Sequence, residues 1–199
     1  CALPIFFETI DDLNVSTYVM ETVYKNKKYR NHLEMRGNIQ TIMLGFSDGT
    51  KDGGYLTANW SILKAKESLT KISRKYGIKV IFFDGRGGPP ARGGGNTHQF
   101  YSSLGSLVES EQIQLTVQGQ TISSNFGTID SSQYNLEQLI SSGLNNKIIA
   151  DKEIFTASHR RTLNKLSEIS YKSYSDFKSH PKFVPRSEEH TSELQSPCN

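Results

Sequence analysis

The sequence predicts an α/β fold with a parallel β-sheet, either an open doubly wound sheet or part of a TIM-like barrel, and a large helical portion. Short apolar segments rich in β-forming residues alternate with helical segments over residues 1–130. Each apolar segment is followed by a polar residue, which is typical of parallel sheets with their chemistry at the carboxyl ends of the strands. After Tyr134 the pattern becomes helical throughout.

The strands are expected in four segments: Ala2 to Phe7, Thr41 to Phe46, Lys79 to Phe83 and Ile113 to Val117. An open doubly wound sheet and a closed barrel both fit this alternation. A complete eight-stranded barrel takes about 250 residues, whereas this chain has 199 residues. A barrel built on these four strands would therefore be incomplete, because half of one cannot close.

Helices are expected between and after the strands. Thr9 and the acidic residues that follow it suit a helix first turn. Residues 55–76 have helical spacing and stop at Gly77, which can adopt the left-handed conformation that ends helices. Residues 154–177 form a long amphipathic stretch. The predicted organisation is a partial barrel over 1–130 and a helical segment over 131–185.

The composition is that of a globular protein, with 35% hydrophobic residues and a formal net charge of +3. This modest charge favours neither a nucleic-acid nor a membrane partner. The sequence has no apolar run of membrane-spanning length, residues 1–25 lack the pattern of a secretory signal, and the two cysteines lie at the chain ends. A cytoplasmic protein is the simplest interpretation.

Residues 186–199 differ abruptly from the rest, with one leucine and no aromatic residue. This segment resembles the in-frame translation of a common sequencing-adapter oligonucleotide, and we interpret it as non-native. A native polar tail is the alternative.

Two carboxylates follow predicted buried strands, Glu8 after the first and Asp48 after the second. An isolated charge there would be costly to desolvate unless it were paired or bound to a cation. Two protein oxygen ligands, with room for water and substrate, suit Mg²⁺ or Mn²⁺. The alternative is that each carboxylate caps the helix that follows it.

Two glycine-containing loops carry cationic side chains. Lys51 lies in the loop after the second strand and can reach a phosphate or a carboxylate; a surface lysine in a turn is the alternative. Arg86, Gly87, Gly88 and Arg92 lie in the loop after the third strand. Its main-chain amides and guanidinium groups can bind an anion. An arginine/glycine RNA-binding tract is the rival interpretation.

Together these segments resemble phosphoenolpyruvate carboxylase, from about Leu3 to Pro185. The similar motifs are Phe-Glu-Thr-Ile-Asp-Asp-Leu at 7–13, Gly-Phe-Ser-Asp-Gly-Thr-Lys-Asp-Gly-Gly at 45–54, Gly-Arg-Gly-Gly-x-x-x-Arg-Gly-Gly-Gly at 85–95 and Gln-Gly-Gln at 118–120. The resemblance implies carboxylation of phosphoenolpyruvate by bicarbonate to oxaloacetate and phosphate, through carboxyphosphate and an enolate.

The resemblance also implies residue roles. Glu8 and Asp48 would bind Mg²⁺ or Mn²⁺, and Lys51 would be an active-site lysine. Arg86, Gly87 and Gly88 would bind the substrate, with Arg86 on its phosphate. Arg92 would serve both binding and catalysis in the glycine loop.

The resemblance has two departures. Many members of the family have histidine where this chain has Asp84, and the family's catalytic histidine motif lies upstream of this segment. We therefore expect a fragment that is inactive alone, from a parent enzyme that is a homotetramer by resemblance. Another phosphoenolpyruvate-using barrel enzyme is the second enzymatic alternative.

Overall fold

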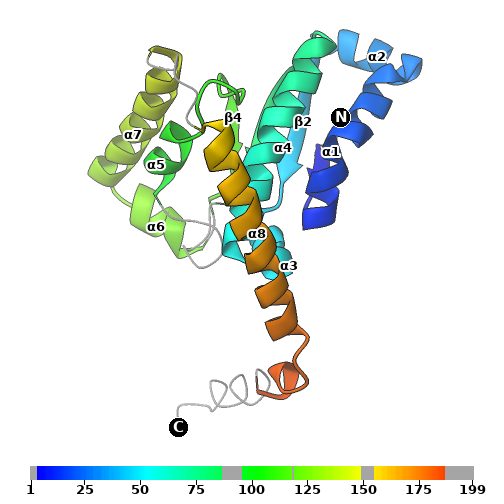
Figure 1. The fold of residues 1–199 in the computed structure, drawn as a ribbon. Helices are drawn as coiled ribbons and strands as arrows, with labels where there is room; N and C mark the ends of the chain where they lie inside the picture. Colours follow the sequence, from blue (N-terminus) through cyan, green and yellow to red (C-terminus); the bar gives the residue numbers. More distant parts are fainter. Residues whose placement is uncertain (1–3, 87–95, 118, 149–154, 187–199) are drawn as a thin grey trace.

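The structure is a computed structural model that describes residues 4–86, 96–117, 119–148 and 155–186. Strands and helices alternate in its first part, and helices alone follow (Figure 1). In chain order the elements are β1 (Ile5–Phe7), α1 (Ile10–Lys25), α2 (Lys27–Glu34), β2 (Ile39–Leu44), α3 (Phe46–Gly53), α4 (Tyr55–Lys75), β3 (Lys79–Asp84), α5 (Thr97–Ser102), β4 (Ile113–Leu115), α6 (Gln120–Phe126), α7 (Ile129–Ile148) and α8 (Ala157–Lys178).

The four described strands form one parallel sheet in the order β1-β2-β3-β4, which confirms the predicted parallel α/β class. Ile5 lies opposite Ile42, and Leu44 lies opposite Asp84. Since neighbouring strands in the sheet are also neighbours in sequence, each crossover joins adjacent strands.

The second strand differs from its predicted bounds, because β2 begins at Ile39 and ends at Leu44. Phe46, predicted as the last strand residue, instead opens α3. Its ring is buried and packs edge-on against Phe100, with ring centroids 5.4 Å apart. An aromatic residue is equally apolar in a strand and at a buried helix start, so the pattern could not distinguish the two.

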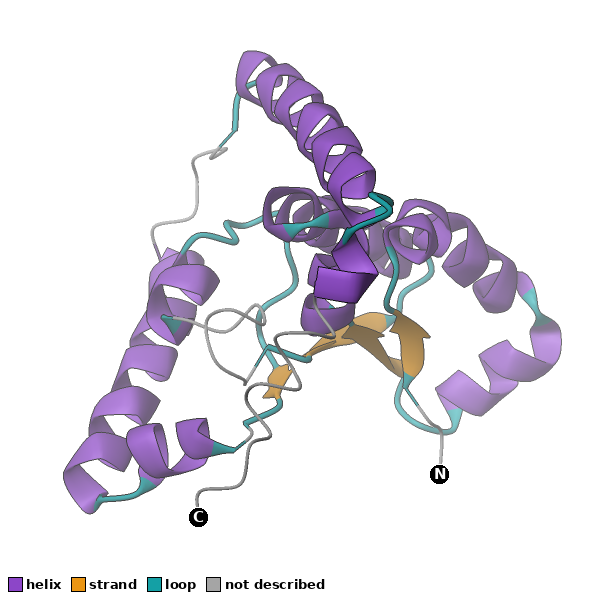
Figure 2. Cartoon of the chain, turned by 90° about the horizontal axis from the view of Figure 1, so that it is seen from below, coloured by secondary structure: helices purple, strands orange, loops and turns teal. Residues whose placement is uncertain are grey.

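Helices lie against one face of the sheet (Figure 2), and the core is on that face. Alternate residues of the two central strands are buried, among them Ile42 and Phe82, and they join a cluster with residues of α1 and α4 such as Met20 and Leu69. The residues between them, such as Met43, are half-buried on the opposite face. The described helices therefore cover one face of the sheet, and the face that carries Met43 is not covered by them.

Two predicted helix boundaries are confirmed. Thr9 is the N-cap of α1 and forms a capping box with Asp12. Helix α4 covers Tyr55–Lys75, and Gly77 follows it with φ of +64°, the left-handed conformation that ends helices.

Helix α8 crosses α4 and reaches α3 (Figure 1). Arg160 forms two hydrogen bonds of 2.7 and 2.8 Å with Glu67 of α4. The Trp60 indole donates to Asn164 at 2.8 Å. The amphipathic stretch predicted over 154–177 therefore docks on the sheet-covering helix. Among the described residues, no helix combines the length and apolarity that crossing a membrane requires.

Candidate functional site

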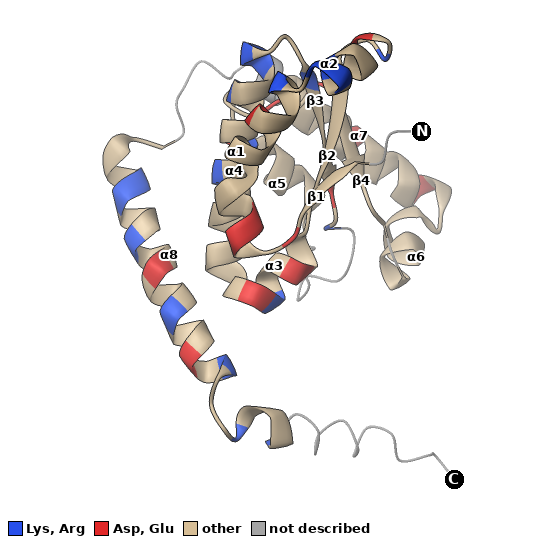
Figure 3. Ribbon diagram, turned by 90° about the vertical axis from the view of Figure 1, so that its right-hand side faces the viewer, with Lys and Arg blue, Asp and Glu red and all other residues tan. Residues whose placement is uncertain are grey.

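Three candidate residues lie at the same edge of the sheet, where β1, β2 and β3 end. Glu8 follows β1, Asp48 lies in the first turn of α3 after β2, and Arg86 follows β3. The carboxyl ends are held in register by hydrogen bonds from Gly45 N to Phe7 O, 3.0 Å, and from Gly85 N to Leu44 O, 3.3 Å. Figure 3 shows acidic segments on α3 and beside the nearby strand ends.

Glu8 packs directly against the turn between β2 and α3. A Cβ atom on Gly45 would lie 2.9 Å from Glu8 Cα and 3.1 Å from Glu8 Cγ, so only glycine fits there. Asp48 is three residues further along this turn and helix. The glycine therefore allows the first carboxylate-bearing segment to approach the second.

Neither carboxylate caps a helix through its side chain, so the capping alternative is wrong for both. Thr9, not Glu8, is the N-cap of α1. The N-cap of α3 is Gly45, which makes no side-chain cap hydrogen bond, and Asp48 lies inside the helix.

Lys51 forms an ion pair with Asp48, with 3.1 Å between Nζ and Oδ1. The two side chains are 70% and 52% exposed, so solvent and a ligand can reach both. The backbone beneath is anchored, since Tyr174 of α8 donates to the Lys51 carbonyl at 3.0 Å. Asp52 accepts a 2.9 Å hydrogen bond from Ile10 N, which ties α3 to α1.

Arg86 is only 7% exposed and lies between aromatic rings. Its Cζ is 3.9 Å from the Phe100 ring centroid and 5.8 Å from that of Phe46. Since Phe46 opens α3, the guanidinium lies near the start of that helix, at the same edge of the sheet as Asp48. Burial lowers the pKa of Arg86, while Tyr101 and Asp84 oppose that shift. The group stays cationic because the intrinsic pKa of arginine is above about 12.

Asp84, the last residue of β3, is fully buried in an ion pair with Lys66 of α4, at 2.7 Å. Tyr101 of α5 donates a 2.8 Å hydrogen bond to the same oxygen, Oδ2. Burial lowers the pKa of Lys66, and the Asp84 carboxylate acts in the opposite direction. Burial also raises the pKa of the Tyr101 hydroxyl, which therefore stays protonated as the donor.

Sequence reasoning noted Asp84 but missed both of its partners. A signal for Lys66 was available, because it lies on the same face of α4 as the buried residues Ile62 and Leu69. A lysine in an apolar helical stripe indicates a buried counter-charge. Nothing local in sequence indicated Tyr101.

Three other predicted site residues, Gly87, Gly88 and Arg92, lie outside the described residues. Within the described ranges, no cluster of three or more His, Cys, Asp or Glu side chains is placed to hold a metal. Glu8 and Asp48 supply two carboxylates at neighbouring strand ends. Their oxygen atoms are the ligand type that Mg²⁺ takes, and Mg²⁺ usually completes its coordination with water and substrate.

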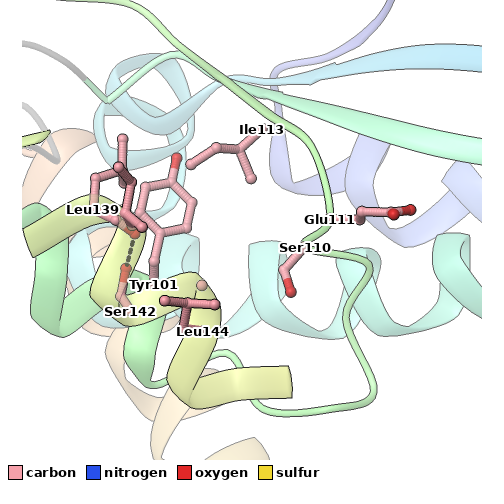
Figure 4. A pocket seen from close by; sticks show the side chains of 9 residues that line it. Tyr101, Ser110, Glu111, Ile113, Leu139, Ser142 and Leu144 are labelled. Atoms are coloured by element: carbon pink, nitrogen blue, oxygen red, sulfur yellow. Dashed lines mark hydrogen bonds between the residues drawn. The ribbon is translucent and has the colours of Figure 1, made fainter. Parts of the chain in front are cut away.

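A separate pocket of about 310 Å³ lies between β4, α5 and α7. Figure 4 shows Tyr101, Ile113 and Leu139 around it, with the Ser142 hydroxyl bonded to the Leu139 carbonyl. The described residues that line it include the Glu111 carboxylate, which disfavours an anionic ligand.

Fold and site together define an α/β protein whose carboxylates and buried guanidinium gather at the carboxyl edge of a parallel sheet, where such folds place their chemistry. The family model described as phosphoenolpyruvate carboxylase matches residues 2–195. This range includes part of the 186–199 segment, whose non-native origin stays a prediction. The chain therefore belongs to the phosphoenolpyruvate carboxylase family.

Curated relatives agree. The chain is 36% identical over 170 residues to phosphoenolpyruvate carboxylase of Corynebacterium efficiens, covering 85% of this chain. It is 37% identical over 164 residues, 82% of this chain, to the enzyme of Corynebacterium glutamicum, and 37% identical over 172 residues, 85% of this chain, to that of Nitrosomonas eutropha. The matched segment spans 18% of the length of each of these relatives.

Proposed function

We propose that this chain is part of an enzyme that carboxylates phosphoenolpyruvate with bicarbonate to give oxaloacetate and phosphate. The observation that supports this most is the buried Arg86 guanidinium at the sheet edge where Glu8 and Asp48 also lie. A fixed cation at the same sheet edge as two carboxylates suits an anionic substrate that binds together with a divalent metal ion. The curated relatives carry the same enzyme name.

In this proposal Arg86 holds the phosphate of the substrate. Its guanidinium is flanked by Phe46 and Phe100, so it loses little side-chain freedom on binding. Glu8 and Asp48 would hold Mg²⁺ or Mn²⁺, which supplies positive charge to the oxygen that becomes anionic during the reaction. Arg92, Gly87 and Gly88 would complete the anion site.

Phosphoryl transfer comes first in the proposed reaction. A bicarbonate oxygen attacks phosphorus and the bond from phosphorus to the enol oxygen breaks, giving carboxyphosphate and the enolate of pyruvate. The enolate carbon then attacks the carboxyl carbon and phosphate leaves. Arg86 stabilises charge on the phosphoryl oxygens throughout, and Lys51, released from Asp48, offers a mobile cation to the carboxylates.

The strand order supports a partial barrel. Adjacent parallel strands in the order β1-β2-β3-β4, with α1 and α4 packed in one core against them, are arranged as in a singly wound barrel. The half-buried face that carries Met43 would then point to the barrel interior. A cytoplasmic homotetramer stays an expectation for the parent enzyme.

The test uses the full-length protein that contains this segment. Bicarbonate-dependent phosphate release from phosphoenolpyruvate is measured for the wild type, for Arg86→Ala and for the control Arg74→Ala. Arg74, near the end of α4, forms an ion pair with Glu109 at 3.0 Å, and its side chain is 56% exposed. We expect the KM for phosphoenolpyruvate to rise by about tenfold or more in Arg86→Ala only, because charge-assisted bonds to phosphate are lost.

Two results would contradict the proposal. A wild-type enzyme that requires a nucleotide would indicate another phosphoenolpyruvate-using barrel enzyme. Salt-dependent RNA binding that is lost in Arg86→Ala would indicate the RNA-binding alternative.

A further inference from the structure

The buried group formed by Lys66, Asp84 and Tyr101 joins three elements at one carboxylate. Lys66 comes from α4, Asp84 ends β3 and Tyr101 comes from α5. Lys66 Nζ and the Tyr101 hydroxyl both donate to Asp84 Oδ2, at 2.7 and 2.8 Å. The side chains of Lys66 and Asp84 are 1% and 0% exposed. A bare buried ion pair is often no more stabilising than apolar residues, so its presence calls for a role.

This network is adjacent to Arg86 both along the chain and through Phe100. Asp84 and Arg86 are separated only by Gly85, whose amide donates to Leu44 O of the neighbouring strand. Tyr101 is preceded in α5 by Phe100, whose ring lies 3.9 Å from the Arg86 guanidinium carbon. The Tyr101 hydrogen bond therefore ties α5 to the end of β3 and fixes where the Phe100 ring stands.

The Lys66 ammonium also contacts three aromatic rings, including those of Phe100 and Tyr101. Its Nζ lies 5.1 Å from the Phe82 ring centroid, 5.4 Å from that of Phe100 and 5.8 Å from that of Tyr101. Cation–π attraction and the Asp84 ion pair thus act on one cluster. Movement of α5 would break the Tyr101 hydrogen bond to Asp84 and the stacking of Phe100 on Arg86 together.

We propose that the Lys66–Asp84–Tyr101 network is a positioning device that holds Phe100 and, through it, the Arg86 guanidinium in place for an anionic substrate. The network positions Arg86 whatever the substrate is. Its effect on phosphoenolpyruvate binding rests on the proposed function. The three residues are positioning residues, because they act through Phe100 and Arg86.

The first experiment needs no enzyme activity. The Nε–Hε signal of Arg86 is followed by NMR in this 199-residue chain, with Arg86→Lys used to assign it. The stacked Phe100 ring should shift that signal through its ring current. We expect Tyr101→Phe to lose most of the shift.

Tyr24→Phe is the matched control. Tyr24 also has a buried hydroxyl, 2.9 Å from Ser73 Oγ, in the contact between α1 and α4. The Tyr24→Phe substitution removes a comparable hydrogen bond but does not touch Lys66, Asp84 or Tyr101, so the ring-current shift of the Arg86 signal should persist. An unchanged shift in Tyr101→Phe, or an equal loss in both variants, would overturn the proposal.

A charge-neutral variant covers the case in which Tyr101→Phe does not fold. Lys66→Met combined with Asp84→Asn removes both charges and leaves an amide oxygen as acceptor for Tyr101. The hydrogen bond becomes a neutral one and the cation beneath the rings is lost, so the Arg86 shift should shrink. A folded double variant with the full wild-type shift would also overturn the proposal.

Kinetics in the full-length enzyme test whether the positioning of Arg86 affects the binding of phosphoenolpyruvate. Tyr101→Phe should raise the KM for phosphoenolpyruvate about fivefold and leave the KM for bicarbonate unchanged, whereas Tyr24→Phe should change neither. Unchanged KM values in Tyr101→Phe would overturn the catalytic consequence. If the wild type does not carboxylate phosphoenolpyruvate, the proposed function fails, and the NMR result still decides the positioning.

Discussion

At the residue scale, Gly45 determines how closely the two carboxylate-bearing segments approach. The space for its missing Cβ is taken by Glu8, at 2.9 Å from Cα and 3.1 Å from both Cβ and Cγ. The nearest atom belongs to the backbone of β1's end, so it cannot move aside as a flexible side chain would. Any side chain at position 45 must therefore push Glu8 away from the α3 turn.

We accordingly expect Gly45→Ala to destabilise the fold by about 1–3 kcal/mol, the usual cost of forcing extra atoms into a packed place. Urea unfolding measures this directly. In the full-length enzyme, the same variant should require more Mn²⁺ for half-maximal activity. Gly143→Ala in α7 is the control, because its added Cβ has no described neighbour within 4 Å other than its own helix backbone. Equal stability of the two variants would contradict the packing argument.

The Lys66–Asp84 pair should be intolerant of a single neutralisation. Asp84→Asn leaves the Lys66 ammonium buried without a counter-charge, so the free energy of unfolding should fall by about 3–5 kcal/mol. Glu21→Gln is the comparison, since Glu21 forms a surface ion pair with Lys75 whose side chain is 62% exposed. That change should cost far less than Asp84→Asn by the same urea measurement, because solvent screens an exposed ion pair. Similar losses would show that the buried lysine is neutral.

The sequence identified residues whose role depends on chain position, and it missed those whose role depends on tertiary contact. Glu8 and Asp48 could be placed at one edge because parallel strands end together. The meeting of Lys66, Asp84 and Tyr101 requires the distance between α4, β3 and α5, which no local pattern carries. Helical spacing could have indicated that Lys66 is buried, but not which group it meets.

At the element scale, the start of α1 makes the stability of the protein sensitive to acid. The hydrogen bonds from the Thr9 and Glu8 amides and from the Thr9 side chain lower the pKa of Asp12 below its ordinary value of 3.8. A carboxyl group with a lowered folded-state pKa stabilises the fold above its unfolded pKa. That contribution is lost as the pH falls through the folded-state value.

The stability difference between the wild type and Asp12→Asn should therefore be present at neutral pH and vanish below pH 3.8. Thr9→Ala should cost about 1 kcal/mol at neutral pH through loss of the N-cap. Unfolding in urea across the pH range tests both.

Thr156→Ala at the N-cap of α8 is the matched control, because that cap accepts from His159 N and involves no carboxylate. A difference for Asp12→Asn that persists at low pH would contradict the capping-box account.

Element bounds followed the sequence where composition and periodicity agree. Helix α4 was predicted to within a residue, because its apolar spacing, its length and Gly77 all indicate the same helix. Strand β2 begins and ends two residues earlier than predicted. An apolar residue such as Phe46 fits either the end of a buried strand or the start of a buried helix, so the pattern could not place this boundary. Strand β4 is shorter than predicted, ending at Leu115. The last residues of a strand depend on its neighbour, here β3, more than on their own composition.

At the scale of the whole molecule, the chain carries one side of a proposed active site. It spans 18% of the length of its curated relatives, so we expect the purified chain not to release phosphate from phosphoenolpyruvate. A direct phosphate assay with Mg²⁺ and bicarbonate, run beside the full-length enzyme, tests this. Turnover by the chain alone would mean that residues 1–199 contain every group the reaction needs.

The outermost position of β1 and β4 in the described sheet has a consequence for handling the protein. An outer strand presents amide and carbonyl groups that can pair with any extended peptide, including another copy of the same chain. Because β1 and β4 have only three residues each, such pairing is brief on either side, and aggregation of the chain through these edges should be limited.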